Sequence, residues 1–396
     1  MKSFEFHAPV KLISGKGSLD HLAYELQSLG VTRPLIITDK GIVQAKVVDI
    51  VISSLLEANN EKSIVFDDVP PNSSFSTIMK ILNFYNQNNC DGIIALGGGS
   101  VMDSAKAVNI LVSYKSEKLY DFAGAGVVNK KLRPFIALPT TSGTGSEVTK
   151  VSVIFDEQKN KKIPFSSSFL FPDTAILDPR LTQKLPVHIT AATAMDALTH
   201  AIEAFIGLSK NPVSDIYAEL AVEKVFKNIK LLIRDPEHLG HRQELALAST
   251  FAGIAFSNSM VGLVHAIGHS VGAHCHLHHG VCMSLFLPHV LRYQLDKCEE
   301  DISQILKFII GEEAYFLTLK EHRASKCIEQ IDSLIKFLNE TAKLPISLKD
   351  TKKVSEKDFN IIAQNAINDG SMMYTIDEYG TEDVLKILKI AWDYRL

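Results

Sequence analysis

The sequence predicts a two-part fold: an α/β domain with a mostly parallel sheet, followed by an all-helical domain. Over about the first 180 residues, short apolar strands alternate with helical segments, the pattern of a parallel sheet covered by helices. Beyond the Asp-Pro-Arg at 178–180, strand-like runs almost disappear and helical periodicity dominates. Pro179 and Pro186 suit a connection between the two parts. We therefore expect domains over residues 1–183 and 184–396.

The elements of the first domain follow from periodicity and boundary residues. Residues 1–15 contain alternating and apolar pieces typical of one or two edge strands. The stretch Ser18 to Leu29 predicts a helix, because Ser18 can cap it, leucines recur on one face and Gly30 can end it. The other expected elements are a strand at 34–38, a helix at 42–58, a strand at 63–66, a helix at 75–86, a strand at 92–96, a helix from 100 to about 111, and a strand at 134–138.

The second domain shows the 3.6-residue period of helices throughout. The expected helices cover residues 191–205, 212–229, 242–256, 263–274, 281–295, 328–343, 356–365 and 381–394.

Composition limits the classes of function. The 396 residues are 46% hydrophobic and 22% charged, as in soluble globular proteins, and the net charge of −4 gives no electrostatic basis for binding nucleic acid or an anionic membrane. No apolar run approaches the roughly 20 residues that span a bilayer, and the N-terminus lacks the apolar core of a secretory signal. The five cysteines are scattered without a CxxC pair. We expect a cytoplasmic protein with free thiols.

A glycine turn lies between a buried strand and a helix at residues 92–108, GIIALGGGSVMDSAKAV. Glycines let the backbone approach an anion, and the start of the following helix offers free N–H groups, so a diphosphate is the natural ligand. The turn is neither GxGxxG, because position 102 is methionine, nor a Walker loop, because no Gly-Lys-Ser/Thr follows. The alternative is a tight turn with no ligand, with Asp103 and Lys106 as a surface ion pair.

A second loop, PTTSGTGSE at residues 139–147, also follows a buried strand, and Asp39 ends another. Ligands of such sheets bind at the carboxyl ends of the strands, so the two loops together favour a nucleotide. A carboxylate at Asp39 would accept hydrogen bonds from ribose hydroxyls and repel a 2′-phosphate, which favours NAD over NADP. The alternatives are a hydroxyl-rich loop that caps the next element and an Asx turn at Asp39.

Histidines are concentrated at residues 264–280, VHAIGHSVGAHCHLHHG, which hold six of the chain's 14. Upstream, Asp196 and His200 are four residues apart on an apolar helix, and His265 precedes His279 by one helix and a connection. One carboxylate with three imidazoles fits Fe²⁺ or Zn²⁺ with open coordination positions. The alternatives are a hydrogen-bonded helix pair at 196 and 200, or a structural zinc site. His274, His276 and His278 have no assigned role.

A metal beside a nicotinamide predicts a specific reaction. The metal would act as a Lewis acid on an alcohol or carbonyl oxygen, while hydride passes to or from the nicotinamide ring. His269, one turn after His265, is placed to relay a proton to solvent. Its alternative is a hydrogen-bonding partner of the metal ligands.

Five motifs together resemble the iron-containing, or group III, alcohol dehydrogenases: GGGSVMDSAKA, PTTSGTGSEVT, MDALTHAIEAF, VHAIGH and HHGVCMSLFLPHVLRY. The resemblance implies the dehydroquinate-synthase-like architecture, a short-chain alcohol or aldehyde as substrate, NAD and Fe²⁺ (or Zn²⁺) as cofactors, and a homodimer or higher homo-oligomer with residues 4–13 compatible with its interface. It implies Asp196, His200, His265 and His279 as metal ligands, and Phe256 as a residue of the substrate pocket. It implies cofactor contacts by Asp39, Asn72, Gly98, Gly99, Ser100, Asp103, Thr140, Thr141, Thr144, Thr149, Val151, Lys162 and Leu181.

The sequence departs from that family pattern at three places. Asn-Ser-Met-Val stands at 258–261 where many relatives are glycine-rich, His278 stands where many have proline, and Met-Met-Tyr-Thr stands at 372–375 where an Asn-Pro-Arg-like segment is common. The extra imidazole of His278 beside a ligand affects the choice of metal or the polarity of the pocket, and the departure at 372–375 affects the substrate rather than the reaction class. Two other functions remain possible: a polyol dehydrogenase or cyclising lyase of the same architecture, which tends to use other ligands, and a non-catalytic protein with a decayed site.

Overall fold

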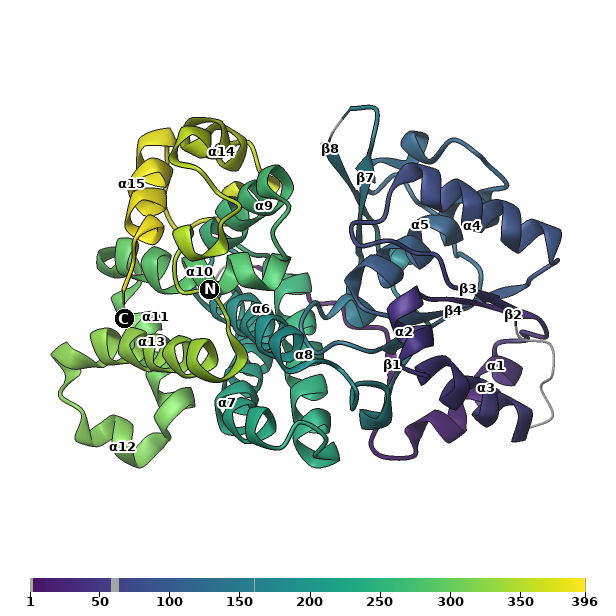
Figure 1. The fold of residues 1–396 in the computed structure, drawn as a ribbon, viewed down its shortest axis with the longest axis horizontal. Coiled ribbons are helices and arrows are strands. Elements are labelled where there is room, and N and C mark those ends of the chain that lie inside the picture. Colours follow the sequence, from purple (N-terminus) through teal and green to yellow (C-terminus); the bar gives the residue numbers. More distant parts are fainter. Residues whose placement is uncertain (1–2, 58–63, 160, 396) are drawn as a thin grey trace. The chain divides into compact units, whose positions relative to one another are not determined.

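The computed structural model describes residues 3–57, 64–159 and 161–395 (Figure 1). The chain divides into two compact units, one formed by Ala8–Leu185 and the other by Pro186–Leu396 together with the segment up to His7. The first is an α/β unit and the second is helical, as the sequence predicts. Residues 3–7 thus belong with the helical unit, although no boundary between them and the strands that follow was expected from the sequence.

The α/β unit contains a six-stranded parallel sheet in the order β1-β9-β6-β4-β2-β3. Its strands are β1 (Lys11–Ser14), β2 (Pro34–Ile37), β3 (Ile64–Phe66), β4 (Gly92–Gly97), β6 (Phe135–Pro139) and β9 (Thr174–Leu177). The central strands β2, β4, β6 and β9 are buried along their whole length. This burial explains the continuous apolar runs that predicted β2, β4 and β6, whereas β9 was not predicted.

Helices cover both faces of this sheet. Because successive side chains of a strand point to opposite faces, Leu35 and Ile37 pack into one core while Ile36 packs into the other. The first core also contains side chains of α4 (Phe75–Gln87) and α5 (Gly99–Tyr114), and the second contains those of α1 (Leu22–Ser28) and α3 (Val47–Glu57) (Figure 1).

The helix expected at 42–58 is two helices, α2 (Lys40–Gln44) and α3, because Lys46 between them has a left-handed backbone with φ 59°. The ends of two predicted elements, residues 58 and 63, lie outside the described residues. The helix expected from Ser18 begins as a 3₁₀ turn, and Ser18 is its first residue rather than its cap.

A second, three-stranded sheet was not predicted. It consists of β5 (Gly124–Ala125), β8 (Lys161–Ser166) and β7 (Val151–Asp156), with β7 and β8 antiparallel. In β8, Pro164 and the two lysines obscure the alternation of apolar and polar residues that is typical of a strand. The short strand β9 of the larger sheet was also not predicted.

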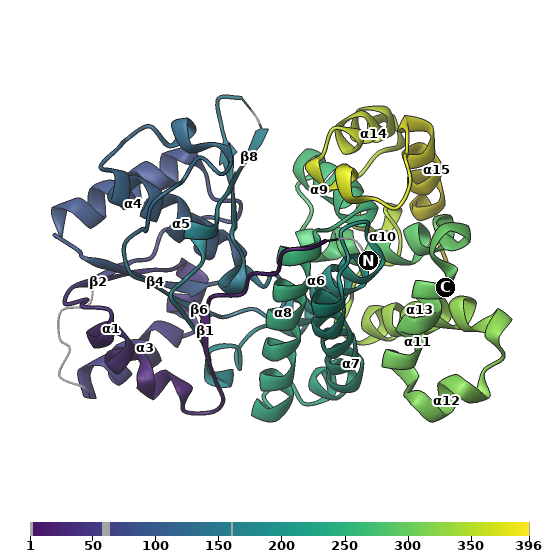
Figure 2. The ribbon, with the colours of Figure 1, turned by 180° about the vertical axis from the view of Figure 1, so that it is seen from behind.

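The helical unit is organised around α6 (Val187–Ile206), which is buried continuously from Thr190 to Ile206. It packs against α7 (Pro212–Arg234), α8 (Leu239–Ser259) and α10 (His279–Tyr293), and Figure 2 shows the first two beside it. The remaining helices are α9 (Leu263–Cys275), α11 (Leu295–Ile310), α12 (Glu312–Leu317), α13 (Arg323–Ala342), α14 (Phe359–Ile367) and α15 (Thr381–Trp392). Helices α11 and α12 were not predicted, although the apolar residues of α11 recur on one face with helical spacing.

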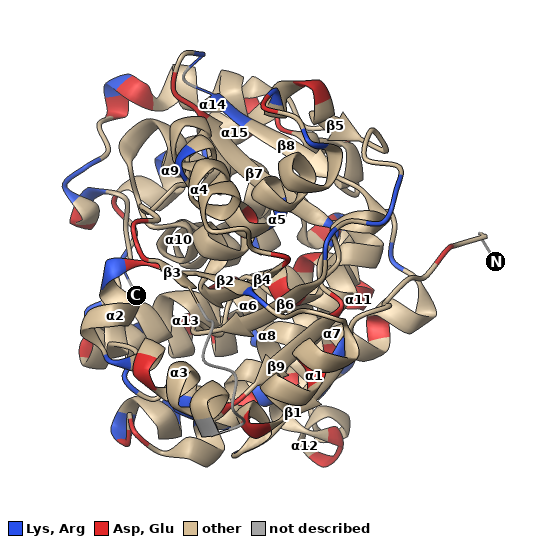
Figure 3. Cartoon of the chain, turned by 90° about the vertical axis from the view of Figure 1, so that its right-hand side faces the viewer, with Lys and Arg blue, Asp and Glu red and all other residues tan. Residues whose placement is uncertain are grey.

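Within the described residues, no single helix is both long and apolar enough to cross a membrane; α8 and α9 meet the criterion only as a pair, bent by 106°. Basic and acidic residues are interspersed along the helices rather than gathered on one element (Figure 3).

Candidate metal centre and cofactor-binding edge

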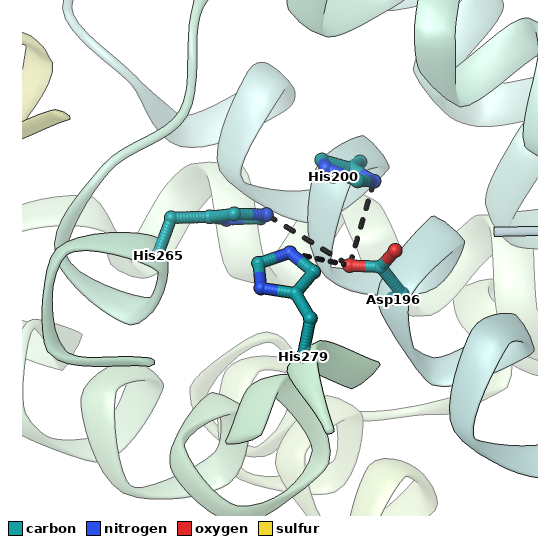
Figure 4. A group of neighbouring side chains, drawn as sticks. All are labelled: Asp196, His200, His265 and His279. Atoms are coloured by element: carbon teal, nitrogen blue, oxygen red, sulfur yellow. Dashed lines mark ion pairs between the residues drawn. The ribbon is translucent and has the colours of Figure 1, made fainter. Parts of the chain in front are cut away.

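Four predicted metal ligands converge in the helical unit. Asp196 and His200 lie one turn apart on α6, His265 lies on α9, and His279 is the first residue of α10. One ligand atom from each lies within 4.8 Å of all the others, and this is the only such group of His, Cys, Asp or Glu in the described chain. The side chains point toward a common centre (Figure 4).

The distances are centred on one carboxylate oxygen. Asp196 Oδ1 lies 3.2 Å from His279 Nε2, 3.8 Å from His200 Nδ1 and 4.0 Å from His265 Nε2. Asp196 Oδ1, His200 Nδ1 and His265 Nε2 are buried and have no hydrogen-bond partner among the described residues. Buried polar atoms normally have hydrogen-bond partners. Three unpaired atoms that face one another therefore fit a site in which one cation is coordinated by all three. A mixed oxygen and nitrogen donor set fits Fe²⁺ or Zn²⁺.

The protonation states suit metal binding. Burial would raise the pKa of the Asp196 carboxyl, but the imidazoles of His200, His279 and His265 outweigh burial and hold that pKa below its usual range. Burial lowers the pKa of His200 to about 3, against the opposing effect of Asp196. Burial also places the pKa of His265 well below its usual value. At neutral pH the cluster therefore presents one charged carboxylate and neutral buried imidazoles, the forms that ligate metals.

The backbone around His279 explains its position. His276 has a left-handed φ of 53° and ends α9, so α10 begins only three residues later. A Cβ on Gly280 would lie 2.1 Å from the carbonyl oxygen of Ala192, so only glycine lets the start of α10 approach α6 this closely. Of the unassigned histidines, His274 lies on α9 with its Nε2 atom 3.3 Å from Asp358, away from the four ligands.

Glu203 is a buried residue of the site that the sequence interpretation missed. Its Oε2 atom lies 2.5 Å from His265 Nδ1, and its carboxylate also accepts hydrogen bonds from the backbone N–H groups of Gly262 (3.0 Å) and Val264 (2.6 Å). The carboxylate thereby binds the start of α9 and keeps the Nδ1 proton of His265 on the side away from Asp196. The signal was present in the sequence, because Glu203 is seven residues after Asp196 in an otherwise apolar helix.

His269 and Phe256 lie next to the ligands. The His269 ring is 5.3 Å from that of His279, and its Nδ1 atom lies 3.1 Å from Asp369, a partner that the sequence did not suggest. The Phe256 ring stacks on His200 at 4.3 Å. Proton relay by His269 and lining of a substrate pocket by Phe256 stay predictions, but both side chains are in contact with the metal ligands.

In the α/β unit, the two predicted cofactor loops meet at the carboxyl ends of the adjacent strands β4 and β6. The backbone N–H of Thr140 donates to the carbonyl of Gly97 at 3.1 Å. A Cβ on Gly98 would lie 3.1 Å from Thr141, and one on Gly99 would lie 3.0 Å from Thr144. We call residues 97–100 and 140–144, with Asp39 and Asn72, the cofactor-binding edge.

Asp39 and Asn72 occupy special backbone positions at this edge. Asp39 caps α2, and its Oδ1 atom accepts a hydrogen bond from Ile42 N, three residues later, at 3.0 Å. The side chain thus binds local backbone as a helix cap rather than as the Asx turn of the alternative, and a ribose contact stays a prediction. Asn72 has a left-handed φ of 56°, and its N–H donates to Ser100 Oγ at 3.2 Å.

The remaining predicted cofactor residues surround α5 or lie further away. The carboxylate of Asp103 accepts from Ser146 Oγ at 3.0 Å and from Val153 N at 2.9 Å, so it is not half of a surface ion pair. Thr149 precedes β7, Val151 begins it, and Lys162 lies on β8 opposite Phe155. Leu181 is buried in the core on the α1 side of the sheet. Their contacts with a cofactor stay predictions.

Comparison with known proteins covers nearly the whole chain. Residues 9–179 match the family model for iron-containing alcohol dehydrogenase, and residues 190–392 match that for the C-terminal part of the Fe-containing alcohol dehydrogenase family. The chain is 31% identical to the NAD-dependent methanol dehydrogenase of Bacillus methanolicus, over 98% of this chain and 99% of that one. It is 33% identical to the 1,3-propanediol dehydrogenase of Klebsiella pneumoniae, over 99% of both. The structure of sulfoacetaldehyde reductase from Bifidobacterium kashiwanohense in complex with NAD⁺ superposes with a TM-score of 0.85, at 26% identity and 99% coverage of both chains.

Proposed function

Because the chain belongs to the iron-containing alcohol dehydrogenase family, we propose that it interconverts a short-chain alcohol and its aldehyde with NAD as hydride carrier and Fe²⁺ as metal. The observation that carries this proposal is the buried cluster of Asp196, His200, His265 and His279, whose facing polar atoms lack other partners among the described residues. Zn²⁺ is the alternative metal, because the same donors bind both.

The residues of the cluster and their hydrogen-bond partners have different roles in the proposed reaction. When bound, the metal supplies a Lewis acid that polarises the C–O bond, and the nicotinamide ring accepts or gives the hydride. Glu203 fixes the ring of His265 through Nδ1, so its Nε2 lone pair faces Asp196. Asp369 orients His269 in the same way, which leaves Nε2 of His269 as the atom that exchanges the substrate proton with solvent.

The cofactor proposal rests on the α/β unit. The glycine turn at the start of α5 brings bare backbone and a helix N-terminus to the carboxyl edge of the sheet, where a diphosphate is stabilised by N–H groups and the helix dipole. Asp39, at the end of β2, favours the unphosphorylated ribose of NAD. Substrates of about one to four carbons are proposed from the methanol, propanediol and butanol in the names of similar proteins.

We further propose a cytoplasmic homodimer or larger homo-oligomer. The five cysteines are all free, which suits a reducing compartment. Strand β1 lies at one end of the six-stranded sheet with Leu12 37% exposed, and an edge strand of this kind can pair with a second copy. Light scattering after gel filtration measures the oligomeric state, and a monomeric mass at micromolar concentration would overturn the dimer.

The test of the function is a metal and substrate panel. Protein purified without oxygen is loaded with Fe²⁺ or Zn²⁺, its metal content is measured, and NADH formation is followed with methanol, ethanol, 1-butanol, 1,2-propanediol and 1,3-propanediol. We expect one metal per chain and alcohol-dependent NADH formation. Metal-loaded protein that binds NADH but oxidises none of these alcohols, and reduces none of the matching aldehydes, would overturn the proposal.

A further inference from the structure

Lys106 lies inside the α/β unit, which rules out the alternative of a surface ion pair with Asp103. It is on α5, its side chain is fully buried, and it is among the largest fully buried side chains described. A buried ammonium is costly unless hydrogen bonds replace its hydration. Its environment therefore indicates a specific role.

Four oxygen atoms surround the ammonium. Lys106 Nζ lies 2.8 Å from the carbonyl of Val151, 2.9 Å from the carbonyl of Thr149, 3.0 Å from Thr149 Oγ1 and 3.0 Å from Ser146 Oγ. All four belong to residues 146–151, the stretch between the threonine loop and β7. One side chain of α5 thus binds the whole stretch.

Asp103, one turn earlier on α5, completes the network. Ser146 Oγ donates its hydrogen to Asp103 Oδ1 and accepts one from Lys106. The neutral amine has two N–H groups and a lone pair, and the two carbonyls alone would use both hydrogens. Loss of the proton would therefore turn the Ser146 hydroxyl toward the amine and break its bond to Asp103.

We propose that Lys106 is a positioning residue for the cofactor, whose buried ammonium holds residues 146–151 in the conformation that binds NAD. This inference rests on the proposed NAD-dependent function, because Thr149 and Val151 are expected cofactor contacts and Thr144 lies against the glycine turn just before them. The Lys106 ammonium binds the carbonyl groups of Thr149 and Val151. It would therefore affect the cofactor by holding these two residues in place, without touching the cofactor itself.

The same network makes NAD binding sensitive to alkaline pH. Burial lowers the pKa of Lys106 to about 8, while Asp103 on α5 and Glu147 in the 3₁₀ turn oppose that shift; Lys162 on β8 acts on Asp103. Between pH 8 and the ordinary lysine range, the unfolded chain binds more protons at this residue than the folded chain. The contribution of Lys106 to the free energy of unfolding therefore rises with pH in that range. The affinity for NAD is expected to fall over the same range.

The experiment measures NADH affinity by fluorescence titration at pH 7 and pH 9, for the wild type and for Lys106→Met, both loaded with metal. For the wild type, a pKa of about 8 predicts that the NADH Kd rises about tenfold, because only the protonated fraction binds. For Lys106→Met we expect an NADH Kd at least about tenfold above that of the wild type already at pH 7. The Kd of this variant should not change further at pH 9, and its metal content should be normal. The exposed Lys118→Met is the matched control, and its affinity should follow the wild type.

The outcomes separate this inference from the proposed function. A wild-type Kd that is the same at both pH values, or a folded Lys106→Met that binds NADH like the wild type at pH 7, would overturn the role of Lys106 and leave the function intact. No NADH binding by the wild type at pH 7 would overturn both. If Lys106→Met does not fold, the wild-type titration decides alone, and thermal unfolding at both pH values shows whether affinity falls without a loss of stability.

Discussion

The metal cluster and the cofactor-binding edge differ in whether their polar side chains already have hydrogen-bond partners in the protein. In the helical unit, three buried ligand atoms face one another without hydrogen-bond partners in the described chain. In the α/β unit, the charged side chains behind the edge bond to protein groups, as Asp103 does to Ser146 and Val153. The first region has three unpaired groups that face one another, whereas in the second the charged side chains are already paired within the protein and Thr140 Oγ1 is a single buried atom without a partner among the described residues.

The difference predicts different responses to ligand loss. A buried polar atom without a partner costs free energy, so the helical unit should be destabilised until a metal binds. The cofactor-binding edge should keep its conformation without NAD, because its hydrogen bonds are internal. Substitutions at the cluster should thus change metal content and stability together, whereas those at the edge should change affinity or cofactor choice.

The largest effect is expected from His265→Ala. Its Nε2 atom is buried in the cluster, so the substitution removes one of four ligands and leaves the Glu203 carboxylate without its imidazole partner. We expect bound metal to be lost and turnover to fall about a thousandfold or more, since Lewis-acid catalysis contributes several kcal/mol. Metal analysis and steady-state rates test this together. His274→Ala, on the same helix but paired with Asp358, is the control; full metal retention by His265→Ala would refute the ligand assignment.

Metal removal should show the second-largest effect. At a free metal concentration about 100 times Kd, binding stabilises the folded state by about 2.7 kcal/mol. For a unit of this size, chelation should lower the melting temperature by about 5–10 °C. Calorimetry with and without chelator measures the shift. A melting temperature that does not change although chelation removes the bound metal would mean that the metal binds the folded and unfolded chain alike, and would refute a site built by the fold.

Glu203→Gln should produce a smaller change of the same kind. The amide keeps the size of the side chain but replaces the buried carboxylate that accepts from His265 Nδ1 and the start of α9. We expect metal affinity to fall about 10- to 100-fold, the usual result of removing such a partner. Competition with a metal indicator measures the affinity, independently of turnover. Unchanged affinity would show that the helix alone fixes the His265 ring.

The same contrast explains what could be predicted from the sequence. The proposed metal ligands are side chains with helical spacing, such as Asp196 and His200 at i, i+4, so their residue types and positions were enough to predict that they lie together. Three central strands of the parallel sheet, β2, β4 and β6, were predicted as well, because they are continuous apolar runs. At the cofactor-binding edge much of the proposed recognition involves backbone atoms, and there the family resemblance supplied the residues.

The missed residues depend on contacts between distant parts of the chain. Asp369 follows His269 by 100 residues, and Glu203 precedes its nearest backbone partner by 59. For Lys106 the spacing to Asp103 offered only a surface ion pair as an alternative, since nothing local indicates the contact with the start of β7. The strands β5, β7 and β8, which form that cover, were themselves not predicted, so the burial of Lys106 could not be inferred either.

The smallest effect is expected at the cofactor-binding edge, from Asp39. Its carboxylate has two separable roles: it caps α2 through Ile42 N, and its charge would repel the 2′-phosphate of NADP. Asp39→Asn keeps a good capping group and removes the charge, whereas Asp39→Gly removes both at a cost of only a few tenths of a kcal/mol in stability. Both variants should therefore improve kcat/KM with NADPH about tenfold or less, corresponding to ~1.4 kcal/mol, with unchanged metal content. An unchanged ratio of NADH to NADPH use in Asp39→Asn would assign the residue to capping alone.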